Sequence, residues 1–213
     1  MPPLTLHRHR ERGSTERLAL DAILDDVLAG TLSTVVDGKP WVVPMLFARQ
    51  GDRILLHGST GAGALRHVAA GAPAALAVIA IDALVVGHTT FDSSANYRSA
   101  VVHGTLTTLG DAERAVALEA LSERILPGRT GEVRPMTRQE QTKTLAMALP
   151  ITEGDFMVKT RSGDASPPDE ETDAWHGIVE LRTVALDPVA APTSRAPEVP
   201  RSVLDFAGAR GLA

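Results

Sequence analysis

Residues 31–47 carry an Asp37-Gly38 pair between two apolar runs, 31–36 and 40–47, and this pair limits the folds open to the chain. Both residues of the pair tolerate a positive φ, which a two-residue hairpin turn requires. A hairpin sets its two strands side by side and antiparallel. The segment therefore predicts an antiparallel sheet that begins near residue 31.

Further short apolar runs separated by turn residues continue this pattern. Strands are expected at 53–57, 74–81, 84–89 (after a turn at Asp82), 98–109, 145–151, 156–160 and 175–186. Helices are expected at 14–29, 64–70, 111–126 and after Thr137, where Glu140 completes a capping box. Strands do not alternate regularly with long helices, which counts against a Rossmann-type sheet. Many short strands with a few peripheral helices favour a closed or partly closed antiparallel barrel.

A length of 213 residues suits one domain with additions at its ends. The expected organisation is a polar lead-in at 1–13, a barrel domain at 14–186 and a loosely held tail at 187–213. Four prolines precede Arg201 in that tail, which disfavours regular structure there.

Charge and composition exclude several classes of partner. The net charge is −5 and no basic cluster stands out, which argues against a nucleic-acid partner. The longest apolar run, 72–81, contains Pro73 and is too short to span a bilayer. The first residues contain no apolar stretch of signal-peptide length, so a cytoplasmic protein is expected. There are no cysteines, which excludes disulfides, thiolate metal sites and cysteine nucleophiles.

A loop rich in small residues follows the expected strand 53–57. It runs from His57 through Gly58, Ser59 and Thr60 into a helix that carries Arg66. Backbone N–H groups at a helix start favour an anion, and hydroxyls and a guanidinium would add to this. The lysine and spacing of a P-loop are missing. The loop is a candidate phosphate cradle, and an ordinary strand-to-helix turn is the alternative.

Two further segments could present polar groups to a ligand. Proline in Val43-Pro44-Met45 leaves a strand position without a donor, so nearby backbone groups are open to a ligand, although an edge strand or bulge has the same signature. Asn96-Tyr97-Arg98-Ser99 joins a turn-forming cluster to an apolar strand and places an amide, a phenol, a guanidinium and a hydroxyl in a row. The alternative there is a plain turn before a strand.

Other catalytic signatures are absent from the sequence. The seven histidines show no metal-ligand spacing, and no His-Glu-x-x-His pattern occurs. No serine lies in a Gly-x-Ser-x-Gly elbow, so nucleophilic hydrolysis has no support.

Taken in order, these segments resemble the FMN-binding split-barrel family related to pyridoxamine 5'-phosphate oxidase, and within it the nitroimidazole-resistance type. The resemblance rests on the opening hairpin 30–45, His57-Gly58-Ser59, Asn96-Tyr97-Arg98-Ser99, and Leu126-Pro127-Gly128-Arg129, Arg134-Pro135, Thr137 with Glu140, Val158-Lys159-Thr160-Arg161 and Trp175-x-Gly177. It covers residues 5–190 approximately.

The resemblance implies a six-stranded antiparallel split β-barrel and a homodimer with two FMN sites at its interface. The implied cofactor contacts are Val43, Pro44, Met45, His57, Gly58, Ser59, Thr60, Arg66, Asn96, Tyr97, Arg98, Ser99, Lys159 and Trp175. Two departures matter. Ala62-Gly63 stands where the family often has Ser-Arg, which shifts the phosphate charge to Arg66, with Lys159 and Arg98 next in line. Asp92-Ser93 stands where a His-His pair is common, so the resemblance does not extend to a reaction that uses those histidines.

The expected function is FMN-dependent electron or hydride transfer to or from a small molecule. One alternative is a non-catalytic flavin carrier with the same site. Another is a related barrel that holds haem or a deazaflavin, for which His57 and His103 are the candidate haem ligands. No residue is predicted to act as a catalytic acid or base.

Overall fold

The computed structural model describes residues 6–59, 61 and 63–211. Their strands are β1 (Gly13–Ser14), β2 (Ala29–Val36), β3 (Lys39–Gln50), β4 (Arg53–Ser59), β5 (Pro73–Val86), β6 (Ser94–Thr105), β7 (Thr107–Thr108), β8 (Thr144–Pro150), β9 (Phe156–Arg161) and β10 (Gly177–Glu180). Their helices are η1 (Arg10–Arg12), α1 (Arg17–Asp26), α2 (Gly63–Ala69), α3 (Asp111–Ile125), η2 (Arg129–Gly131), α4 (Arg138–Thr142) and α5 (Arg201–Arg210).

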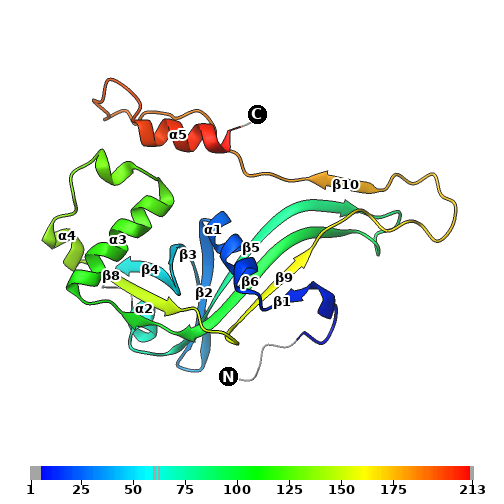
Figure 1. Ribbon diagram of the computed structural model, residues 1–213, viewed down its shortest axis with the longest axis horizontal. Helices are drawn as coiled ribbons and strands as arrows, with labels where there is room; N and C mark the ends of the chain where they lie inside the picture. Colours follow the sequence, from blue (N-terminus) through cyan, green and yellow to red (C-terminus); the bar gives the residue numbers. More distant parts are fainter. Residues whose placement is uncertain (1–5, 60, 62, 212–213) are drawn as a thin grey trace.

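The strands form one curled antiparallel sheet in the order β1-β9-β6-β5-β2-β3-β4-β8-β7, with β10 added to β5 (Figure 1). The sheet curls until β6 approaches β8: a Cβ added at Gly104 would lie 3.0 Å from Leu149 Cδ1. The mainly β, antiparallel split-barrel prediction is confirmed. The sheet does not close, and its ten strands in the described chain exceed the expected six.

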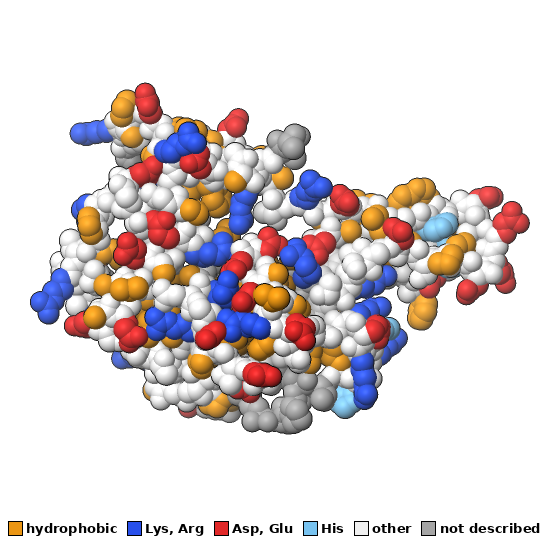
Figure 2. All heavy atoms as spheres, viewed as in Figure 1, with side chains coloured by type: hydrophobic (Ala, Val, Ile, Leu, Met, Phe, Trp, Pro, Cys, Tyr) orange, Lys and Arg blue, Asp and Glu red, His pale blue; other side chains and the backbone are white. Residues whose placement is uncertain are grey.

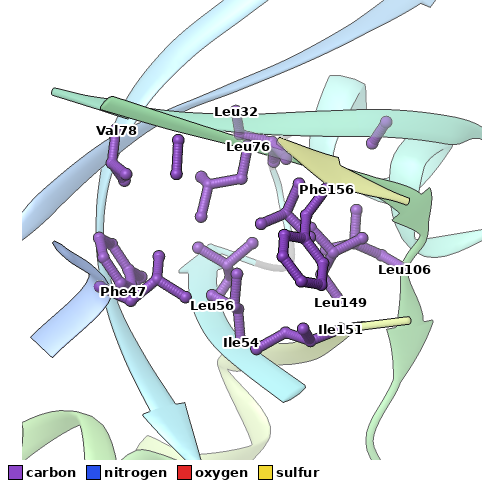
Figure 3. Packing of buried hydrophobic residues seen from close by; sticks show 14 of the residues in the cluster. Leu32, Phe47, Ile54, Leu56, Leu76, Val78, Leu106, Leu149, Ile151 and Phe156 are labelled. Atoms are coloured by element: carbon purple, nitrogen blue, oxygen red, sulfur yellow. The ribbon is translucent and has the colours of Figure 1, made fainter. Parts of the chain in front are cut away.

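The inner side of the curled sheet is filled by aliphatic and aromatic side chains. Leu32, Phe47, Leu56, Leu76 and Phe156 are buried and point toward one another from five different strands (Figure 3). The apolar side of α1 packs against the same cluster through Leu20, Ile23 and Leu24. A second, smaller cluster lies between α3 and the strands β3, β4 and β8. The packed interior leaves the outer side of the sheet as the surface for a ligand.

The Asp37-Gly38 hairpin is confirmed. Both residues have a positive φ, of 50° and 74°, and β2 pairs with β3 along the whole length of β2. The capping box is also confirmed, because Thr137 accepts from the Glu140 N–H while the Glu140 carboxylate accepts from the Thr137 N–H.

Two predicted boundaries are wrong. Asp82 does not form a turn between two strands but lies at a bulge inside the continuous strand β5, where the register with β6 shifts. Its carbonyl accepts from the Leu181 N–H and its carboxylate from Arg98, which satisfies its polar groups within the sheet. The expected strand 175–186 shortens to β10, because residues beyond 180 leave the edge of β5.

Other boundaries also differ from the expected ones. The first helix begins at Arg17, since Ser14 pairs with Val158 in the β1–β9 ladder. The expected strand 98–109 is two strands, because β6 begins at Ser94 and ends at Thr105 before β7 pairs with β8. The tail contains the helix α5, which the sequence pattern does not anticipate.

Replacing Gly87 with alanine is expected to lower the free energy of unfolding by about 1–3 kcal/mol. A Cβ at this position would lie 2.6 Å from the Asp92 carbonyl carbon and 2.9 Å from the Ser93 N atom, so the backbone of the β5–β6 connection must shift. Denaturant unfolding measures the change. Gly131→Ala is the matched control, because a Cβ there meets nothing within 4 Å. Equal effects of the two substitutions would contradict this packing.

Candidate functional site

An exposed apolar surface covers the outer side of the sheet. Side chains of a strand alternate between its two faces, so residues whose neighbours are buried in the core point outward. We define the outer apolar face by the exposed hydrophobic side chains on β2, β3, β5 and β10, which are Val35, Val42, Leu46, Ile79, Ile81, Leu84 and Val179. In these strands, apolar residues occupy both the odd and the even positions, so both faces of the sheet are apolar. This pattern is the sequence signal for the outer apolar face, and the motifs alone do not reveal it.

Alternation along the strands divides the predicted contact residues between the two sides of the sheet. Val43 and Met45 pack against the core, whereas Pro44 between them faces outward. On β6, Ala100 and Val102 are buried in the core, so Tyr97 and His103 lie on the outer side. Lys159, Ser99 and Tyr97 share that side, since Ser99 pairs with Lys159 across the β6–β9 ladder.

The Asn96–Ser99 junction is held by bonds within the chain. The Asn96 amide donates to the Gly163 carbonyl at 2.8 Å, and its oxygen accepts from Arg161 at 2.7 Å. Only 7% of Asn96 is exposed, so these bonds satisfy a buried amide. Ser99 donates to the Lys159 carbonyl at 3.2 Å. Asn96 and Ser99 therefore tie β6 to β9 and to the chain that follows β9.

Arg98 lies on the inner side and joins three elements. It donates to both carboxylate oxygens of Asp82, at 3.0 and 2.6 Å, and lies 2.9 Å from Asp26 at the end of α1. Hydrogen bonds from the guanidinium to these carboxylates raise the pKa of Arg98. With both carboxylates engaged, Arg98 fixes the bulge of β5 against α1 in this chain.

The 57–66 segment is the end of β4 followed by α2. Gly58 packs tightly against α2, since a Cβ there would lie 2.3 Å from Leu65 Cδ1. Ser59 accepts from the Gly61 N–H at 3.2 Å, and Arg66 is exposed on α2. Thr60 lies outside the described residues. α2 spans seven residues, so its N-terminus alone makes no anion site, and the phosphate role of this segment stays a prediction.

His57 is half-buried on the side of β4 that faces the second cluster. Its Nδ1 atom is buried and has no partner among the described groups. Burial lowers the pKa of His57, because desolvation disfavours the imidazolium. A neutral imidazole with an open nitrogen is thereby placed at the end of β4.

The two main polar segments lie at opposite ends of the β5–β6 ribbon. Asn96 pairs with Ala83, and Gly104 pairs with Ala74 at the other end, beside α2. Eight residues of strand separate Asn96 from Gly104, or about 26 Å at ~3.3 Å per residue. The chain by itself therefore does not bring the Asn96 junction and the α2 loop together.

The third polar region lies where β10 joins β5. Trp175 is exposed just before β10, and a Cβ at Gly177 would lie 3.2 Å from its ring. His176 meets His88 edge to face, with ring centroids 6.5 Å apart. His88 Nε2 lies 3.5 Å from Asp92, and its Nδ1 is buried without a described partner.

A cavity of about 330 Å³ lies among the helices α3, η2 and α4, away from the predicted contact residues. Its lining includes Arg129 and Arg134, which belong to the motifs that carry the family resemblance. Each guanidinium is already paired, Arg129 with Glu132 and Arg134 with Glu140. Ion pairs therefore hold this loop in place, and neither arginine is free to bind an anionic ligand.

The α4 end of this wall is expected to loosen in acid. Hydrogen bonds from Arg134 and from the Thr137 N–H lower the pKa of Glu140 to about 2. A carboxylate whose pKa is lowered on folding stabilises the fold above its unfolded value, near 4.3, and this is lost as the pH falls toward 2. The protection factors of the backbone amides in residues 138–142, which correct for the intrinsic pH dependence of exchange, should therefore fall across that window. Glu140→Gln should remove the pH dependence, and persistence of the dependence in that variant would contradict the assignment.

Within the described ranges, no helix is both long and apolar enough to cross a membrane. The same residues contain no group of three or more His, Cys, Asp or Glu side chains arranged to hold a metal ion.

The family model for pyridoxamine 5'-phosphate oxidase matches residues 16–156. No curated protein matches the chain in sequence.

Among solved structures, the FAD- and haem-binding protein from Mycobacterium smegmatis is 40% identical, with 92% of this chain and 97% of that chain covered and a TM-score of 0.88. The flavocytochrome Anf3 from Azotobacter vinelandii is 26% identical, with 94% of each chain covered and a TM-score of 0.86.

A protein from Bacteroides thetaiotaomicron described as a 5-nitroimidazole antibiotic resistance protein shares the fold. It is 18% identical and has a TM-score of 0.57, with 68% of this chain and 86% of that chain covered. The neighbours thus include proteins described as binding flavin and haem. By the match of the family model over most of its sheet, this chain belongs to the pyridoxamine 5'-phosphate oxidase family.

Proposed function

We propose that the protein is a flavoprotein that binds FAD and haem on the outer apolar face, between two copies of the chain. The full-length similarity to a protein described as FAD- and haem-binding carries this proposal. FAD replaces FMN as the first choice, because that relative's name specifies FAD. FMN and a deazaflavin are the alternatives.

The outer face has the chemistry that a flavin needs. A flavin ring is apolar on its faces, and Ile79 and Ile81 offer exposed aliphatic surface in the middle of β5. Tyr97 and Lys159 flank these residues on β6 and β9. Neither Lys159 nor Arg66 forms an ion pair with a described residue, so both remain open to a phosphate group. The ammonium of Lys159 and the guanidinium of Arg66 fit a flavin phosphate. The flavin itself would supply hydride and single-electron chemistry.

For haem, the structure favours one of the two candidate histidines. His103 lies on the outer side of β6 beside Ala75, and its imidazole has no described hydrogen-bond partner. His57 lies at the end of β4, on the side that leads under α3. We therefore propose His103 as the residue that would bind the haem iron and as the one to test first.

A homodimer accounts for surface that one chain leaves open. The chain exposes 13488 Å², whereas a compact monomer of its 22.5 kDa mass exposes about 9,500 Å². The difference, about 4,000 Å², exceeds one partner's share of an obligate homodimer interface. A two-fold axis that runs across the strands would set opposite ends of the two identical faces together. The Asn96 junction of one copy would then meet the α2 end of the other.

With these cofactors we propose electron transfer to or from a small molecule, in the cytoplasm. A carrier without turnover is the second candidate. Reduction of the bound flavin by a nicotinamide cofactor under anaerobic conditions, followed by reoxidation with a small acceptor, separates the two functions. A flavin that no reductant can turn over would favour the carrier.

The haem assignment has its own test. His103→Ala should lose the haem absorbance of the purified protein and keep its flavin. His57→Ala is the matched control and should keep the haem. Loss of haem in the His57 variant alone would reverse the assignment.

A further inference from the structure

Residues 181–211, which we call the C-terminal arm, follow β10 and lie beyond the residues that the family model matches. The arm leaves the edge of the sheet, runs back above it and ends in α5, on the side of the molecule where α3 lies (Figure 1). Exposed hydrophobic side chains line the β10 side of the molecule, and acidic side chains gather at its far tip (Figure 2).

The arm buries very little against its own chain. Ser202 is its one buried residue within the described part of the chain. Leu186 and Val189 are 77% and 93% exposed, and Leu204 of α5 is 48% exposed. A helix of ten residues is marginal in water unless one of its faces is packed. The arm therefore leaves Leu186, Val189 and Leu204 uncovered.

The arm is attached to the rest of the chain at Leu181 and at Ser202. The Leu181 N–H donates to the Asp82 carbonyl at 2.9 Å where the arm leaves the sheet. The Glu132 carboxylate accepts from the Ser202 N–H at 2.9 Å and from its hydroxyl at 2.5 Å at the start of α5. Leu186 and Val189 lie between these anchors. The arm is thus held in place while its middle remains available for another surface.

We propose that the C-terminal arm clasps the second copy of this chain. The proposal rests on the dimer proposed above and assigns to the arm a part of its interface. Continuity supports this occupant: Val179 of β10 pairs with Leu84 of β5, so the arm begins at the edge of the outer apolar face. A partner that covers that face would adjoin the arm where the arm leaves β10. By two-fold symmetry each copy would hold the other.

The absence of cysteine makes a direct test available. Val189→Cys places a single thiol in the middle of the arm. Leu18→Cys is the matched control, because Leu18 is 84% exposed on α1, which packs on the inner side of the sheet. Each variant is labelled with a maleimide reagent over a range of protein concentrations, while sedimentation reports the fraction of dimer.

In the dimer, the Val189 thiol should react at least about tenfold more slowly than the Leu18 thiol, since labelling would require the arm to open. Dilution to monomer should restore its rate. Equal rates in a sample that sedimentation shows to be dimeric would overturn the clasp and leave the dimer standing. Protection that persists in the monomer would show that the arm packs on its own chain. A chain that is monomeric at all concentrations would overturn the dimer and the clasp together.

A second variant tests the contribution of the arm to assembly. Leu186→Asp with Val189→Asp should raise the dimer dissociation constant at least about tenfold. The midpoint of denaturant unfolding at concentrations where the chain is monomeric should stay unchanged, because both side chains are exposed there. An unchanged dissociation constant would overturn the proposal.

Discussion

Replacing Ile79 with aspartate is expected to give a monomer that has lost most of its flavin. Ile79 is 60% exposed in the middle of β5, on the outer apolar face, and pairs with Ser99 of β6. In a dimer that covers this face, the new carboxylate would be buried without a partner. Such a group costs about 2–5 kcal/mol at an interface, or roughly 30- to 5,000-fold in the dissociation constant.

Light scattering measures the mass, and flavin absorbance per chain measures the occupancy. Leu18→Asp is the control, since it adds the same charge to a still more exposed position on α1, which packs on the inner side of the sheet. The isolated Ile79 variant should unfold at the same denaturant concentration as the parent chain in its monomeric form. A dimer of parental affinity with full flavin would remove the outer face from the proposed interface.

Replacing Phe47 with alanine is expected to lower the free energy of unfolding by about 3–5 kcal/mol. Phe47 is fully buried inside the curled sheet, where Leu56 is its partner on β4. The substitution would leave a cavity that the neighbouring strands cannot fill without losing their register. This loss is a large part of the stability of a typical domain.

Denaturant unfolding checks this value, and Phe91→Ala provides the comparison. Phe91 is 93% exposed in the β5–β6 connection, so its removal should change the free energy of unfolding by less than about 0.5 kcal/mol. A loss below about 1 kcal/mol for Phe47→Ala would contradict the packing of the inner cluster.

The fold could be predicted from local signals wherever one residue type decides the backbone. Asp37-Gly38 required a positive φ at both positions, and the structure has it. Thr137 and Glu140 cap a helix through their own side chains. Asp82 misled the prediction, because a turn-forming residue inside an apolar run also suits a bulge. Its partners Arg98 and Leu181 are distant in sequence, and no local pattern reveals them.

The site was less predictable because a strand has two faces. Asn96, Tyr97, Arg98 and Ser99 are adjacent in sequence, yet Arg98 turns inward to Asp26 while Tyr97 turns outward. The same alternation separates Pro44 from its two neighbours. The four residues could form one contact surface only if all of their side chains lay on one side of β6.

The distance between the Asn96 junction and the α2 end of the sheet could not be predicted for a different reason. Motifs in the order found here predict the family, but not which copy of the chain supplies each group. The Asn96 end and the α2 end of the β5–β6 ribbon are held apart by the length of the strands. No sequence pattern within one chain can show that a symmetric partner would bring them together.

The small molecules that the purified protein holds decide whether it binds FAD and haem. The protein is purified without added cofactor, its absorbance spectrum and mass are recorded, and the released small molecules are identified by mass spectrometry. We expect a dimer of about twice 22.5 kDa that releases FAD and haem. A chain that holds neither cofactor, and takes up neither when both are supplied, would contradict the proposed flavin- and haem-binding function.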